Sequence, residues 1–139
     1  MEDQIRHYRN KLAYELDSWD AYAAQGSGAK IILLDVRSQA AYEKEHVAGA
    51  ISFPHGQVIA ENVVSLDRES EYVTYCDGIG CNASTGGALK MATLGFKVKE
   101  LIGGLTWWRD HGYPTVKNDP ASMTAEALAE SQLAAACDC

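Results

Sequence analysis

The residues of this sequence with the clearest chemical potential are two cysteines, Cys76 and Cys81, in one short segment. Residues 75–84 read YCDGIGCNAS, and Gly78 and Gly80 allow such a loop to curl tightly and point its backbone N–H groups inward. The helix predicted after the second cysteine would add the positive end of its dipole to the same cradle. We therefore expect the backbone to stabilise a thiolate without the help of a basic side chain.

The size of this effect decides whether the thiol is reactive. A thiol with an ordinary pKa of about 8.5 is only roughly 3% ionised at pH 7, and lowering the pKa by about two units would ionise roughly three quarters of it. That change corresponds to about 2.7 kcal/mol, which several charge-assisted hydrogen bonds can supply. The sequence therefore predicts Cys76 as a nucleophile. The predicted active-site loop consists of Asp77, Gly78, Ile79, Gly80, Cys81 and Asn82. The alternative is an inert cysteine at a strand end, because free cysteines are often buried.

Three other cysteines are candidates to resolve Cys76 or to accept sulfur from it: Cys81, Cys137 and Cys139. Cys81 either forms a disulfide with an oxidised or persulfidated Cys76 or merely packs beneath the loop. Cys137 and Cys139 lie near the chain end and either reach Cys76 by a fold-back of the tail or take no part. A four-thiolate zinc site is a further alternative. It would consume the nucleophile, so no metal and no cofactor are expected.

The elements around the loop alternate between strands and helices. Compact apolar runs bounded by turn residues predict buried strands at 31–34, 50–53, 71–75 and 97–102. Helices are predicted at 2–24, with a second part capped by Asp17 or Ser18, and at 39–46, 56–65, 82–94 and 103–110. This alternation predicts an α/β fold with three α/β/α layers around a central parallel sheet. Cys76 then follows a strand directly, at the carboxyl end where such folds bind ligands.

Composition limits the partners and the location. The chain has 139 residues and a net charge of −7, whereas binding of nucleic acid by charge needs a basic surface. No apolar run approaches the roughly 20 residues of a membrane span, and the first seventeen residues are too charged for a signal peptide. We expect a cytoplasmic protein, monomeric or homodimeric, that binds neither nucleic acid nor membranes and whose thiols are mostly reduced.

Four blocks of this sequence resemble the rhodanese-like domains. They are LLDVRS at 33–38, HVAGAISFP at 46–54, YC at 75–76 with its glycine-containing loop, and a closing block with LGF at 94–96, LIGGL at 101–105 and GYP at 112–114. The resemblance implies a parallel sheet of about five strands flanked by helices. It also implies a sulfurtransferase, in which Cys76 takes a sulfane sulfur as a persulfide and passes it to a thiol or another nucleophilic acceptor. Residues 77–82 would supply N–H groups around the outer sulfur. A non-catalytic binding or regulatory module is the alternative, because a fold does not fix function.

The resemblance also suggests how the chain is divided. We expect an N-terminal helical extension over 1–16, the rhodanese-like domain over 17–118, and a C-terminal helical tail over 119–139 that ends in Cys-Asp-Cys. Within these boundaries, 115–120 is predicted to be a linker and 121–136 a helix.

The loop departs from the family pattern in its charge. Many catalytic members carry a basic residue five positions after the cysteine, where this chain has Cys81, and the residue after the nucleophile is acidic Asp77. We therefore expect a small-molecule or protein persulfide, and not dianionic thiosulfate, as the preferred donor. A phosphatase or an arsenate reductase is disfavoured, because residues 77–82 lack the arginine that would stabilise a transferring oxyanion.

Other residues near the predicted site have structural interpretations. Asp35 and Arg37 are expected to form an ion pair or to bond to the backbone at a strand end, with Arg37 near enough to reach the pocket rim. His46 is expected to satisfy a buried carbonyl group. Gly103 and Gly104 are expected to form a tight turn beside the loop, and Trp107 and Trp108 to form core and pocket wall.

Overall fold

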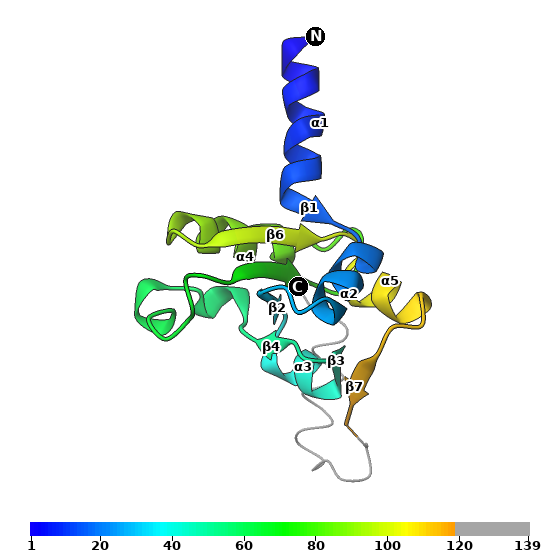
Figure 1. The fold of residues 1–139 in the computed structure, drawn as a ribbon. Coiled ribbons are helices and arrows are strands. Elements are labelled where there is room, and N and C mark those ends of the chain that lie inside the picture. Colours follow the sequence, from blue (N-terminus) through cyan, green and yellow to red (C-terminus); the bar gives the residue numbers. More distant parts are fainter. Residues whose placement is uncertain (119–139) are drawn as a thin grey trace.

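The computed structural model describes residues 1–118, and its centre is a parallel sheet of five strands (Figure 1). In spatial order the strands are β1 (Glu15–Leu16), β6 (Lys97–Leu101), β5 (Glu71–Tyr75), β2 (Ile31–Asp35) and β4 (Ile51–Ser52). All four neighbouring pairs are parallel. The predicted α/β fold with a parallel sheet of about five strands is therefore confirmed. The predicted helix at 121–136, Cys137 and Cys139 lie outside the described residues.

Alternating side chains on the central strands build a separate core on each face of the sheet. Leu33 and Val73 join one cluster, whereas their neighbours Leu34 and Tyr72 join the other. Strand side chains alternate between faces, and a sheet covered on both sides must therefore be apolar at successive positions. This is the physical reason why short continuous apolar runs identified β2 and β5.

Helices close both cores. The first core is covered by α2 (Ser18–Gly26), α3 (Gln39–Lys44) and α5 (Gly104–Asp110), which contribute Ala21, Tyr42 and Trp108. The second is covered by α4 (Ala83–Thr93), which contributes Met91. Asp17 caps α2 as predicted, because its carboxylate accepts a hydrogen bond from the Asp20 N–H at 2.8 Å.

The prediction of a helix at 56–65 is wrong. The segment holds two short 3₁₀ turns, η1 (His55–Gln57) and η2 (Ala60–Asn62). Its buried residues, Val58 and Val63, are five positions apart, a spacing that places two side chains on different faces of an α-helix. An irregular path lets both side chains enter the same core.

The prediction of a linker at 115–120 is also wrong in part. β7 (Thr115–Lys117) pairs antiparallel with β3 (Glu45–Val47), which occupies the end of the predicted helix 39–46. The Glu45 carboxylate accepts hydrogen bonds from the Thr115 hydroxyl at 2.9 Å and from Arg109 at 2.6 Å. The pairing thus depends on residues about seventy positions apart, which local patterns do not show.

The N-terminal helix α1 (Glu2–Tyr14) extends away from the sheet and buries none of its residues (Figure 1). Glu15 and Leu16, which we placed in the N-terminal extension, form β1 at the sheet edge. Among residues 1–118, no helix combines the length and apolar character needed to cross a membrane.

Candidate active site

Cys76 lies directly after β5, at the carboxyl end of the sheet as predicted. The chain at this point is fixed by α5, because the Leu105 N–H donates to the Cys76 carbonyl at 3.0 Å. The next carbonyl, that of Asp77, accepts from both the N–H and the hydroxyl of Thr106, each at 2.8 Å. Hydrogen bonds from the start of α5 therefore hold Cys76 and Asp77 in place.

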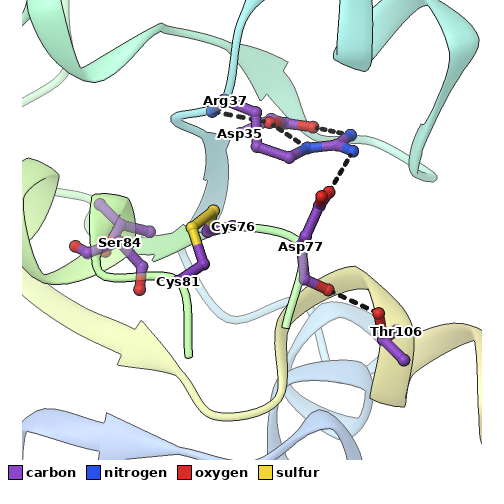
Figure 2. Close-up of a disulfide and its surroundings, with 8 residues drawn as sticks. Asp35, Arg37, Cys76, Asp77, Cys81, Ser84 and Thr106 are labelled. Carbon is purple, nitrogen blue, oxygen red and sulfur yellow. Dashed lines mark hydrogen bonds and ion pairs between the residues drawn. A yellow bond between two sulfur atoms is a disulfide. The ribbon is translucent and has the colours of Figure 1, made fainter. Parts of the chain in front are cut away.

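The central feature of the loop is a disulfide between Cys76 and Cys81 (Figure 2). Their Cα atoms are 6.4 Å apart. The two cysteines that the sequence places in one short loop are therefore joined by a covalent bond. The oxidised loop contains no thiolate, so the predicted ionised Cys76 belongs to the reduced form of the protein.

The two sulfur-bearing residues differ in exposure. Cys76 is only 2% exposed and packs with Leu34, Val36 and Ala83 in the second core. Cys81 is partly exposed and packs against the edge of that core. In the oxidised form, Cys81 is therefore the side of the disulfide that solvent and ligands can approach.

The N-terminus of α4 lies beside the disulfide (Figure 2). Its first residue, Ala83, packs in the same cluster as Cys76, and the buried Ser84 follows. Asn82 occupies the N-cap position but makes no capping hydrogen bond with its side chain. The first N–H groups of a helix have no acceptor within the helix and carry a partial positive charge. The predicted source of positive potential is thus in place next to the cysteine pair.

The glycines of the neighbouring turn are required by close contacts. A Cβ atom on Gly104, whose φ is +56°, would overlap the Cys76 carbonyl oxygen. A Cβ atom on Gly103, whose φ is +80°, would lie 2.5 Å from the Trp107 ring. Only glycine fits at either position, and the predicted tight turn beside the loop is confirmed.

Asp35 and Arg37 form the ion pair expected at the end of β2. Arg37 Nε and Nη2 donate to the two oxygens of Asp35 at 3.0 and 2.7 Å, and Nη2 also donates to the Glu45 carbonyl at 2.6 Å. Burial alone would lower the pKa of Arg37, but the hydrogen bonds and charge of Asp35 outweigh burial and raise it. Tyr75 completes the cluster: its hydroxyl donates to Asp35 at 2.8 Å and accepts from the Val47 N–H at 3.1 Å.

Arg37 also reaches the loop. Its Nη1 atom donates to Asp77 Oδ1 at 2.8 Å (Figure 2). Sequence reasoning placed Arg37 near the pocket rim but did not foresee this partner. The signal available in the sequence was the acidic residue directly after the proposed nucleophile.

A surface hollow of about 470 Å³ opens above the loop. It is lined by Asp77, Gly78, Ile79, Gly80, Cys81, Thr106 and Trp107. Trp107 is 42% exposed there, whereas Trp108 is fully buried and donates its indole N–H to the Pro114 carbonyl at 2.8 Å. The two tryptophans therefore supply pocket wall and core, as expected for the pair, and the structure assigns the wall to Trp107 and the core to Trp108. Asn82 does not line this hollow but lines a neighbouring one with His55 and Ala83.

The described residues show no arrangement for a metal ion. Over residues 1–118, no three His, Cys, Asp or Glu side chains form a group able to hold one. The four-thiolate alternative involves Cys137 and Cys139, which lie outside that range. His46 has the structural role expected of it, since its Nδ1 atom is 2.8 Å from the Tyr42 carbonyl oxygen.

Comparisons with known proteins agree with this architecture. Residues 18–111 match the family model of the rhodanese-like domain. The thiosulfate sulfurtransferase GlpE of Coxiella burnetii is 33% identical over 107 residues, which cover 76% of this chain and 92% of that protein. The HTH-type transcriptional regulator Rv0324 of Mycobacterium tuberculosis is 30% identical over 91 residues, but this chain spans only 40% of its length.

A solved structure resembles nearly the whole chain. The BH2092 protein from Bacillus halodurans is 34% identical, with a TM-score of 0.78 over 93% of this chain and 98% of that one. Together with the match over 18–111 and the cysteine loop at the carboxyl end of β5, this similarity establishes that the chain belongs to the rhodanese-like domain family.

Proposed function

We propose that this protein is a sulfurtransferase that carries sulfane sulfur as a persulfide on Cys76. The observation that carries the proposal is the position of Cys76, between the end of a buried parallel strand and the N-terminus of α4. Membership of the family and the similarity to a protein named as a thiosulfate sulfurtransferase support it.

The proposed chemistry starts from the reduced loop. The Cys76 thiolate attacks the outer sulfur of a persulfide donor, a new S–S bond forms, and the donor leaves as its thiolate. An acceptor thiolate then attacks the outer sulfur of the Cys76 persulfide and restores the Cys76 thiolate. The partial positive charge at the start of α4 stabilises the anion in both resting and loaded states.

The charge of the hollow favours a persulfide donor over thiosulfate. Among residues 1–118, those that line the hollow include one carboxylate, that of Asp77, and no basic side chain. The nearby guanidinium of Arg37 is held by both Asp35 and Asp77. A dianionic donor therefore meets repulsion that a monoanionic persulfide meets to a smaller degree.

A second candidate is a binding or regulatory module that transfers no sulfur. It is favoured by the 2% exposure of Cys76 and by the presence of a related sequence within a transcriptional regulator. This candidate predicts no turnover by the reduced protein with any sulfane sulfur donor.

Steady-state kinetics with the reduced protein distinguishes these proposals. Glutathione persulfide and thiosulfate are compared as donors in the Cys81→Ser background, where no second thiol can form a disulfide with Cys76, with cyanide as acceptor and thiocyanate as the product measured. We expect turnover that Cys76→Ser abolishes, with a higher kcat/KM for the persulfide. Equal rates in this background with and without the Cys76→Ser change would refute the sulfurtransferase, and a higher kcat/KM for thiosulfate would refute the donor assignment alone.

A further inference from the structure

The cysteine pair has a feature that simple sulfur transfer does not use. Transfer to an external acceptor needs one thiol, whereas this loop holds a second sulfur within bonding distance of the first (Figure 2). Because only five positions separate Cys76 and Cys81, the loop itself brings them together. A thiol held so close to a persulfide competes with any acceptor that must diffuse into the site.

We propose that Cys81 resolves the Cys76 persulfide and releases hydrosulfide, so that the protein acts as a thiol-dependent persulfide reductase. This inference rests on the proposed persulfide at Cys76. The Cys81 thiolate attacks the inner sulfur, Sγ of Cys76, and the bond between Sγ and the outer sulfur breaks. The outer sulfur leaves with the electron pair as hydrosulfide. The product on the protein is the Cys76–Cys81 disulfide, which is the bond present in the structure.

The difference in exposure directs the return step. Cys76 is 2% exposed and lies in the second core with Leu34 and Val36, whereas Cys81 lines the hollow with Ile79 and Trp107. A reducing thiol therefore reaches the sulfur of Cys81, forms a mixed disulfide there, and expels Cys76 as a thiolate beside the α4 N-terminus. Cys81 remains in this mixed disulfide until a second reducing thiol attacks the sulfur of the first. The two reducing thiols then leave as their disulfide, and Cys81 is restored as a thiol.

The complete cycle balances. One donor persulfide and two reducing thiols give the donor thiol, one hydrogen sulfide and the disulfide of the reducing thiols. The outer sulfur of the donor is reduced, and the two reducing thiols are oxidised. Ile79 is 73% exposed and Trp107 is 42% exposed at the hollow, so a reductant meets two large apolar side chains next to Cys81, beside the polar Asp77 and Thr106.

A single-turnover experiment tests this inference. Reduced, desalted protein is mixed with one equivalent of glutathione persulfide and no other reductant. Released hydrosulfide is measured over time, and alkylated peptides are mapped. Wild type is expected to release about one hydrosulfide per chain and to gain the Cys76–Cys81 disulfide. Cys81→Ser is expected to keep the sulfur on Cys76 and to release hydrosulfide at least about ten-fold more slowly.

Controls separate the possible explanations. Cys81→Ala serves as a second variant should the serine disturb folding, and the double change of Cys137 and Cys139 to serine is expected to behave as wild type. If Cys81→Ser and wild type keep the persulfide equally long, or if sulfur moves to Cys81 without hydrosulfide release, the resolving role is overturned while the carrier role stands. If Cys81→Ser gains no sulfur at Cys76, the proposed carrier function fails and the inference fails with it.

Discussion

Arg37 at the end of β2 and Asp77 in the cysteine loop are joined by an ion pair of 2.8 Å between Nη1 and Oδ1, although forty positions separate them in the chain. The same guanidinium is held by the fully buried Asp35. The residue after the proposed nucleophile is thus connected to the framework at the end of the neighbouring strand. Asp77 has a structural role as well as an electrostatic one.

Replacing Arg37 should destabilise the fold strongly. Arg37→Gln leaves the buried Asp35 carboxylate without its cation, and breaking a buried pair from one side costs about 3–5 kcal/mol. The matched control is Arg6→Gln, because Arg6 is 69% exposed and pairs with an exposed Asp3, a contact worth about 1 kcal/mol at most. Urea unfolding measures both. Similar losses of unfolding free energy for the two variants would show that the buried Asp35–Arg37 pair contributes no more to stability than an exposed ion pair.

Asp77→Asn should change donor preference more than stability. It removes the only carboxylate that the described part of the chain, residues 1–118, places in the lining of the hollow, and it releases one donor of Arg37 toward the site. We expect the ratio of kcat/KM for thiosulfate to kcat/KM for glutathione persulfide to rise about ten-fold, equivalent to about 1.4 kcal/mol of relieved repulsion. An unchanged ratio would mean that the loop charge does not select the donor.

Gly104→Ala tests the contact between the glycine turn and the cysteine loop. The added methyl group overlaps the Cys76 carbonyl oxygen at a positive φ, so we expect a loss of about 2 kcal/mol or more. Gly86→Ala is the matched control, because Gly86 lies within α4 with nothing within 4 Å of the new Cβ atom. It should stabilise the protein by about 0.5–1 kcal/mol. Thermal or urea unfolding that finds the same sign for both would contradict the packing described.

Glu45 should make the free energy of unfolding depend on pH in the acidic range. Burial would raise the pKa of Glu45, but hydrogen bonds from Thr115 and Arg109 outweigh burial and lower it below its ordinary value of 4.5. The folded protein then binds fewer protons than the unfolded chain, so the stabilisation is complete above about pH 4.5 and is lost as the pH falls through the lowered pKa. We expect the difference in unfolding free energy between wild type and Glu45→Gln to shrink as the pH falls from about 5 to about 3, the range in which carboxylates ordinarily titrate. A difference that does not vary with pH in urea titrations would refute this assignment.

The sequence allowed the sheet and the loop to be predicted because their signals are local. β2 and β5 are apolar at successive positions, as a strand buried on both faces must be, and Cys76 follows β5 without a gap. The pairing of Cys76 with Cys81 was foreseeable for the same reason, since they share one loop. The burial of Cys76 was predicted only as the alternative to a nucleophile, because the core cluster that Cys76 joins also contains residues from other segments, such as Leu34 and Val36.

The features that escaped prediction join distant segments. β3 and β7 are three residues each, too short to show alternation, and they are specified by contacts of Glu45 with Arg109 and Thr115. The link from Arg37 to Asp77 likewise depends on the register of β2 against β5, which places Asp35 opposite Tyr75. Register becomes known only when the strands are paired in three dimensions.

The persulfide on Cys76 is tested most directly by locating one transferred sulfur atom. Reduced Cys81→Ser protein, which keeps any persulfide it forms, is incubated with glutathione persulfide and analysed by intact-mass spectrometry and peptide mapping, with Cys76→Ser/Cys81→Ser as the control. We predict a gain of about 32 Da, one sulfur atom, on the peptide that contains Cys76 and no gain in the control. An unchanged mass, or a gain of the same size in the control, would contradict it.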